Sequence, residues 1–118
     1  MKRKDALGAY GERLAATHLE QAGLTLLERN WRCSDGEIDL IATDGDAVVF
    51  CEVKTRSSVA YGHPAEAVVR AKAARLRRLA ARWLAEQDAG WPEVRFDVVA
   101  VVRSPRGAAT VTHLRGAF

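Results

Sequence analysis

Two acids and a lysine stand close together near the middle of the sequence, in segments that have the pattern of β-strands. Asp39 lies in residues 36–43, and Glu52 and Lys54 lie in residues 47–54. Hard cations such as Mg²⁺ bind oxygen ligands, usually one or two carboxylates together with waters and phosphate oxygens. A lysine beside such an ion can offset the charge that develops on a reacting phosphate. These residue types therefore point to metal-dependent chemistry on phosphate groups.

The two strands are expected to form a hairpin, which would bring the acids together. Asp44 and Gly45 predict a two-residue loop between them. That loop would place Asp39 opposite Phe50, and it would make Asp39 and Glu52 diagonal neighbours with Cα atoms about 7–8 Å apart. Glu37 would share their face. Three carboxylates on one face repel each other, so we expect compensation from Lys54 or from a bound divalent cation.

Hydrophobic spacing predicts the elements that carry these residues. The expected order is α-β-β-β-α-β-β, with helices over residues 5–22 and 64–87 and strands over residues 24–31, 36–43, 47–54, 95–102 and 109–114. Residues 55–63 are expected to form a loop, and Pro64 suits the first turn of the second helix. Gly8 and Gly11 suggest that something approaches the backbone of the first helix closely. We expect an α/β sandwich, in which a mixed five-stranded sheet is flanked by helices.

Composition sets the broad class. The chain has 118 residues, of which 48% are hydrophobic and 28% charged, so we expect one domain over residues 1–118. No apolar run approaches the roughly 20 residues of a membrane span, and no secretory signal is evident. Cys33 and Cys51 have no metal-ligand spacing, and we expect reduced thiols in a cytoplasmic protein. The net charge is only +3, but residues 70–82 carry six basic residues and no acid, which suits phosphate binding.

The motif around the acids resembles a known class. Asp39 followed by Glu52-Val53-Lys54 is similar to the PD-(D/E)XK nuclease pattern, although Ile38 stands where that pattern has proline. Longer strings, which together span nearly the whole chain, resemble the YraN family of largely uncharacterised bacterial proteins: Gly11-Glu12, Asn30-Trp31-Arg32, the segments 36–42 and 50–56, and Arg95-Phe96-Asp97. The resemblance implies a restriction-endonuclease-like fold, similar to that of archaeal Holliday-junction resolvases.

The resemblance also implies a set of site residues. Glu12, Asp39 and Glu52 would bind Mg²⁺ or Mn²⁺, with Glu12 acting through a water, and Lys54 would complete the catalytic site. Basic residues would hold the phosphates of a nucleic acid: Arg56, Arg70, Lys72 and Arg75.

Three functions remain open at this stage. The first is a metal-dependent endonuclease that hydrolyses DNA phosphodiesters, including those of branched or damaged DNA. The second is a catalytically silent nucleic-acid-binding module that retains the acids, and the third is an interaction protein whose basic helix binds an acidic partner. The sequence does not decide between DNA and RNA, and a homodimer is our weaker expectation. Glu37 could be a further metal ligand, but we expect it to face solvent or to pair with an arginine. We expect Asp97 to pair with an arginine, and the tryptophans to serve packing.

Overall fold

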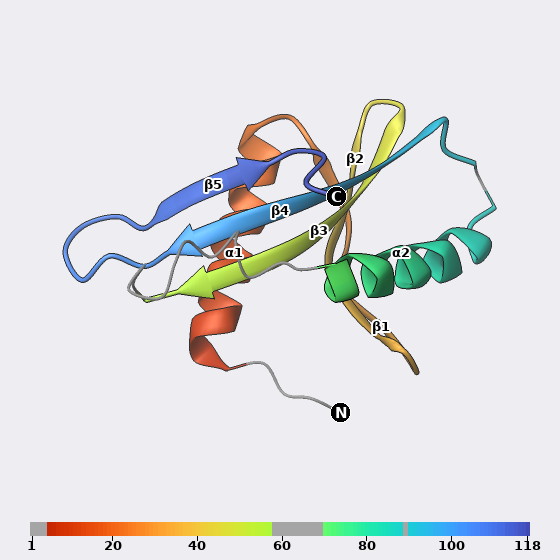
Figure 1. The fold of residues 1–118 in the computed structure, drawn as a ribbon. Coiled ribbons are helices and arrows are strands. Elements are labelled where there is room, and N and C mark those ends of the chain that lie inside the picture. Colours follow the sequence, from red (N-terminus) through yellow and green to blue (C-terminus); the bar gives the residue numbers. More distant parts are fainter. Residues whose placement is uncertain (1–4, 58–69, 89) are drawn as a thin grey trace.

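The computed structural model describes residues 5–57, 70–88 and 90–118. In these residues the chain forms two helices and five strands, in the predicted order (Figure 1). They are α1 (Ala6–Gln21), β1 (Thr25–Cys33), β2 (Gly36–Asp44), β3 (Ala47–Arg56), α2 (Arg70–Ala85), β4 (Glu93–Val102) and β5 (Thr110–Leu114). The predicted start of the second helix at Pro64 and most of the predicted loop lie outside the described residues.

The strands form one mixed sheet in the order β1-β2-β3-β4-β5. The pairs β1–β2, β2–β3 and β4–β5 are antiparallel, whereas β3 and β4 are parallel. A parallel pair needs a crossover connection, and α2 lies in the connection from β3 to β4. The mixed α/β sheet predicted from the sequence is therefore confirmed.

The two helices cover opposite faces of the sheet. Neighbouring residues of β3 point to different faces, so Val49 packs in the cluster that contains Leu19 of α1, and Phe50 packs in the cluster that contains Trp83 of α2. Phe50 and Trp83 meet edge to face, with ring centroids 5.6 Å apart. β3, the central strand, is thus covered by α1 on one face and by α2 on the other.

The start and end of α1 follow from local capping. The Asp5 side chain accepts a hydrogen bond from the Gly8 amide at 2.6 Å and so caps the amino end of the helix. Gly23, just beyond the end of the helix, has a φ of 98°, and its amide donates to the Glu20 carbonyl at 3.0 Å.

The hairpin between β2 and β3 differs from the prediction by one position. Its two loop residues are Gly45 and Asp46, and Asp44 pairs with Ala47. Gly45, with a φ of 64°, takes the first loop position, which is where glycine stands in a type II′ turn; the prediction had placed it second, as in an Asp-Gly type I′ turn. Phe50 therefore faces Ile41 instead of Asp39. Because this slides the register by two residues, the side chains keep their predicted faces.

β3 also continues two residues beyond its predicted end. Its parallel pairing with β4 extends to Arg56 opposite Val102, and the Arg103 amide donates to the Arg56 carbonyl at 2.8 Å. Thr55 and Arg56 are therefore strand residues and not loop residues. Among the described residues, neither helix is long and apolar enough to span a membrane.

Candidate functional site

The ladder between β2 and β3 ends part of the way along both strands. Leu40 and Cys51 are the last pair, although β2 begins at Gly36 and β3 continues to Arg56. Beyond that pair β2 turns away from β3 together with β1 (Figure 1). Asp39 and Glu52 are the next residues on the two strands, so both acids stand where the sheet forks.

Asp39 bridges this fork with its side chain. Its Oδ2 atom accepts a hydrogen bond from the Val53 amide at 2.8 Å, in a place where a ladder bond would otherwise continue. The Asp39 residue is only 7% exposed. A buried carboxylate is costly unless it is hydrogen-bonded, and this bond fixes the orientation of Asp39 toward the third strand.

Glu12 enters the site from α1 because a glycine lets the helix approach the sheet. A Cβ atom at Gly11 would meet the Thr55 side chain, so only glycine allows this contact between α1 and β3. Glu12, the next residue, is 8% exposed and lines the cleft at the fork. Glu12 is therefore one of the buried residues of α1. The close approach expected near Gly8 and Gly11 is confirmed at Gly11.

Glu52 is held between two lysines. Its Oε1 atom lies 3.3 Å from the Nζ atom of Lys54 and 3.7 Å from the Nζ atom of Lys72. Lys54 comes from the same strand, two residues on, and Lys72 comes from the first turns of α2. Burial and the neighbouring Lys54 ammonium lower the pKa of Lys72. The two ammonium groups are thus packed closely around one carboxylate.

A cleft of about 730 Å³ contains all of these residues. It is lined by residues of α1 and of α2, which cover opposite faces of the sheet, so it follows the fork between β2 and β3. Of the residues described, five acidic and five basic side chains line it: Asp5, Glu12, Glu37, Asp39 and Glu52, with Arg32, Lys54, Arg56, Lys72 and Arg75. This mixture can bind a cation and a polyanion side by side.

The structure brings together most, but not all, of the residues selected from the sequence. The four acid and lysine positions share the cleft, as do Arg56, Lys72 and Arg75. Arg56 and Arg75 are exposed, and the Arg56 guanidinium donates to the Thr55 carbonyl at 3.0 Å. Arg70 begins α2, and its side chain lies outside the described part of the chain.

The donor set fits a loosely held divalent cation. No group of three His, Cys, Asp or Glu residues within the described segments is close enough to hold a metal ion together. The acids therefore do not form a preassembled cage of three ligands. Mg²⁺, however, is usually held by one or two carboxylates and completes its shell with waters and phosphate oxygens. Asp39 and Glu52, flanking the fork, supply that smaller set.

Asn30 is a residue that the sequence reasoning missed. It stands across from Asp39, because the pairs on either side of it are Arg29 with Leu40 and Trp31 with Ile38. It has a φ of 52°, and its Oδ1 atom is buried without a hydrogen-bond partner among the described residues. The signal was its residue type, since asparagine tolerates the left-handed conformation better than other non-glycine residues.

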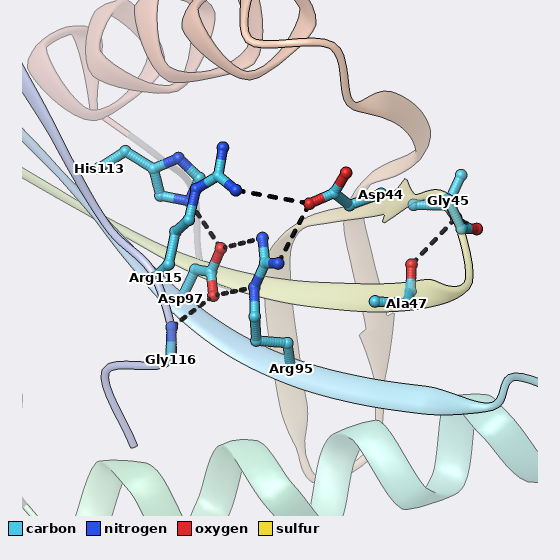
Figure 2. A network of polar contacts seen from close by, with 9 residues as sticks. Asp44, Gly45, Ala47, Arg95, Asp97, His113, Arg115 and Gly116 are labelled. Carbon is cyan, nitrogen blue, oxygen red and sulfur yellow. Dashed lines mark hydrogen bonds and ion pairs between the residues drawn. The ribbon is translucent and has the colours of Figure 1, made fainter.

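A second charged cluster, whose residues do not line the cleft, links β4 to β5 and to the β2–β3 hairpin. Asp97 of β4 is fully buried, and it accepts from Arg95 at 2.9 and 3.0 Å, from the Gly116 amide at 2.9 Å, and is 2.6 Å from the Nε2 atom of His113 (Figure 2). Arg95 also reaches Asp44 near the hairpin loop at 3.1 Å. The expected pairing of Asp97 with an arginine is confirmed.

Other predictions of ordinary roles are also confirmed. Glu37 pairs with Arg32 directly across the β1–β2 hairpin, with Oε2 3.2 Å from Nε. Trp83 is buried in the core, and Trp31 and Trp91 pack against the same cluster. Both cysteines are free thiols, and burial raises the pKa of Cys51.

Fold and site together define a small α/β protein with a cleft of mixed charge at a fork in its sheet. Residues 11–101 match the model of a family described as "Uncharacterised protein family UPF0102". The chain belongs to this family, which agrees with its resemblance to YraN proteins.

Relatives match along almost the whole chain. A UPF0102 protein of Beutenbergia cavernae is 68% identical over 116 residues, which cover 98% of this chain and 98% of that protein. One from Frankia alni is 59% identical over 118 residues, covering 100% and 98%. One from a Nocardioides species is 58% identical over 113 residues, covering 96% and 91%. These relatives are therefore similar to this chain over nearly its whole length.

Proposed function

We propose that this protein is a metal-dependent endonuclease that hydrolyses DNA phosphodiesters, of the restriction-endonuclease-like PD-(D/E)XK type. The observation that carries the proposal is the convergence of Glu12, Asp39, Glu52 and Lys54 on one cleft that basic side chains also line. These residues come from three elements, α1, β2 and β3, and two of the acids are buried. Buried carboxylates are costly and are common where they are used in chemistry.

The reaction consumes only water. A water oxygen forms a bond to phosphorus and one P–O ester bond breaks, which leaves a phosphate monoester and a hydroxyl end. The attacking water loses a proton to solvent, and the leaving oxygen takes a proton from solvent. Lys54 orients the attacking water or offsets the charge that develops on the phosphate.

Asp39 and Glu52 are the residues that would hold Mg²⁺ or Mn²⁺, with Glu12 acting through a water. When bound, such an ion polarises the phosphate and lowers the pKa of a coordinated water. Asp39 is already oriented by the Val53 amide. With such an ion bound, Glu52 would contact it in place of the two lysines, whose ammonium groups would then be available to phosphate.

The basic residues at the rim give affinity for the backbone of a nucleic acid. Arg56, Lys72 and Arg75 line the cleft beside the acids, and we propose that they hold phosphates near the one that is cleaved. Such contacts carry no base sequence, so we expect structure-dependent binding, including binding to branched DNA. Affinity should fall steeply with salt because each phosphate contact releases counterions.

One observation favours a second candidate function. Two ammonium groups already neutralise Glu52, and the acids do not form a ready cage of three ligands in the described segments. A protein in which these ion pairs persist would bind nucleic acid without cutting it. This silent binding module predicts DNA binding that is independent of metal and unaffected by loss of the Asp39 charge.

The decisive experiment is a cleavage assay on labelled duplex, single-stranded and four-way-junction DNA with Mg²⁺, Mn²⁺ or EDTA. Wild type is compared with Asp39→Asn, Lys54→Met and the control Arg78→Met, which removes a charge from an exposed position of α2. The nuclease predicts metal-dependent products that disappear in the first two variants and persist in the control. Salt-sensitive binding without cutting would favour the silent module, and neither binding nor cutting would overturn both.

Duplex cleavage also raises the question of assembly. Cutting both strands of a junction or duplex at once needs two sites, and we propose that the protein acts as a homodimer. Sedimentation of the wild-type protein with and without junction DNA tests this: a mass of one copy in both conditions would contradict it.

A further inference from the structure

Lys72 occupies a position where α2 should carry an apolar residue. It lies one turn before Leu76, and Leu79 and Trp83 continue the same stripe at helical spacing. All three of those residues are buried against the sheet. The helix packing that anchors this stripe therefore aims Lys72 at the sheet, where its side chain is 35% exposed.

The position of Lys72 differs from that of the other basic residues in α2. Arg75 and Arg78 are exposed, whereas Lys72 reaches the half-buried acid Glu52 of another element. When a lysine lies on the apolar stripe, its methylene chain and part of its ammonium group lose contact with water. This lowers stability unless the ammonium group binds something in exchange. A role limited to loose contact with distant phosphates would not require this placement.

Glu52 is the shared partner of two lysines. Lys54 and Lys72 both lie within 4 Å of the same carboxylate oxygen, at 3.3 and 3.7 Å. One carboxylate oxygen thus has both ammonium groups beside it, and Arg75 lines the same cleft. A phosphodiester group carries one negative charge and several acceptor oxygens, and it matches both the sign and the geometry of this pair.

We propose that Lys72 is a second lysine of the reaction centre, which binds with Lys54 the non-bridging oxygens of the phosphate that is cleaved. The inference rests on the proposed nuclease function and deepens it. It moves Lys72 from the flanking phosphates, where the sequence placed it, to the scissile one. β3 supplies the Lys54 ammonium and α2 supplies the Lys72 ammonium, so the two groups come together only when α2 is packed on the sheet.

The test separates chemistry from binding. Single-turnover cleavage of four-way-junction DNA is measured with saturating protein and Mg²⁺ for wild type, Lys72→Met, Lys54→Met and the matched control Arg78→Met. Dissociation constants for the same DNA are measured in EDTA, and thermal midpoints confirm folding. Lys72→Gln repeats the measurement if Lys72→Met does not fold.

We expect Lys72→Met to lower the saturated cleavage rate by roughly 100-fold or more, as loss of one preorganised charge contact does. Arg78→Met should change the rate by less than about twofold, as exposed substitutions do. In EDTA, Lys72→Met and Arg78→Met should weaken DNA binding to a similar, small extent. Lys72→Arg should recover part of the rate, because it keeps the charge but changes its geometry.

Two results would overturn the inference, and they differ. If wild type cuts and Lys72→Met cuts as fast at saturation, Lys72 serves only flanking phosphates and the nuclease proposal stands. If wild type cuts no DNA under any metal condition, the nuclease proposal fails and the inference fails with it.

Discussion

Gly11 of α1 lies so close to Thr55 of β3 that a Cβ atom at Gly11 would stand 1.8 Å from the Thr55 hydroxyl oxygen. The Thr55 Cβ and Cγ2 atoms would both be 2.8 Å away, so rotation of the side chain does not relieve the clash. The next residue of the helix, Glu12, lines the cleft. This contact therefore sets how deeply α1 brings its acid toward the fork in the sheet.

Replacing Gly11 with alanine should move the helix away from β3. Alanine favours a helix over glycine by about 0.5–1 kcal/mol, whereas overpacking a tight contact costs about 1–3 kcal/mol, so the clash should win. We expect a lower free energy of unfolding in urea, by about 1–2 kcal/mol, and weaker cleavage because Glu12 is displaced. Thr55→Ala, which removes the nearest atom, should restore part of both losses in the double variant. A Gly11→Ala protein as stable and active as wild type would show that the helix position is not constrained here.

Asp39 combines a structural and a chemical role that two substitutions can separate. Asp39→Asn keeps an oxygen that can accept from the Val53 amide, so its free energy of unfolding should stay within about 1 kcal/mol of wild type. Asp39→Ala leaves that amide without its acceptor and should cost about 1–3 kcal/mol. Neither variant should cleave DNA, because both lack the carboxylate. Urea unfolding and the cleavage assay measure the two roles, and an active Asp39→Asn protein would show that cleavage does not need the negative charge of Asp39.

The fold could be predicted because its signals are local. Alternation along β3 puts Phe50 on one face of the sheet and Val49 on the other, and helical spacing puts Leu76 and Trp83 on one side of α2. The predicted hairpin loop lay one residue too early in the chain. Asp44-Gly45 fits a type I′ turn and Gly45-Asp46 fits a type II′ turn, so the residue types alone do not choose between the two positions. The faces survived this error because side chains alternate with a period of two.

The site could be predicted only where its residues share a hairpin. Asp39 and Glu52 follow from the β2–β3 pairing, but two further features depend on packing between distant elements. The burial of Glu12 depends on how α1 meets Thr55, and the approach of Lys72 to Glu52 depends on how α2 lies on the sheet. Neither the burial of Glu12 nor the distance from Lys72 to Glu52 is encoded in the spacing of residues along the chain.

Substitutions of Asn30 show whether its left-handed backbone or its side-chain amide supports Asp39 on the neighbouring strand. Asn30→Gly keeps access to the left-handed conformation and removes a buried oxygen, which has no hydrogen-bond partner in the described segments, so stability should change by less than about 1 kcal/mol. Asn30→Ala should be less stable than the glycine variant by about 1–2 kcal/mol, because the left-handed conformation is costly for residues with a Cβ atom. Cleavage should follow stability in both variants. Equal losses in glycine and alanine would instead assign the role to the amide group.

The Asp97 cluster should make the protein sensitive to acid. Burial by itself would raise the pKa of Asp97, but hydrogen bonds from His113, Arg95 and the Gly116 amide outweigh it and lower the pKa to about 2. A carboxyl group whose pKa is lower in the folded protein stabilises the fold above its unfolded-state pKa, about 4 for aspartate, and this stabilisation is lost as the pH falls toward the folded value. The loss should therefore occur between about pH 4 and pH 2 and should amount to roughly 2 kcal/mol.

Asp97→Asn should remove that dependence at the cost of stability near neutral pH. The substitution leaves the partly buried Arg95 guanidinium with Asp44 as its remaining carboxylate partner, which should lower the free energy of unfolding at pH 7 by about 1–3 kcal/mol. Its unfolding free energy should then fall less between pH 5 and pH 2 than that of wild type, as measured by urea unfolding across the pH series. Asp35→Asn is the matched control, because its pair with Arg82 is exposed and should contribute little. Parallel pH curves for wild type and Asp97→Asn would show that the acid sensitivity has another source, since the only ionisable group that the substitution removes is the Asp97 carboxyl.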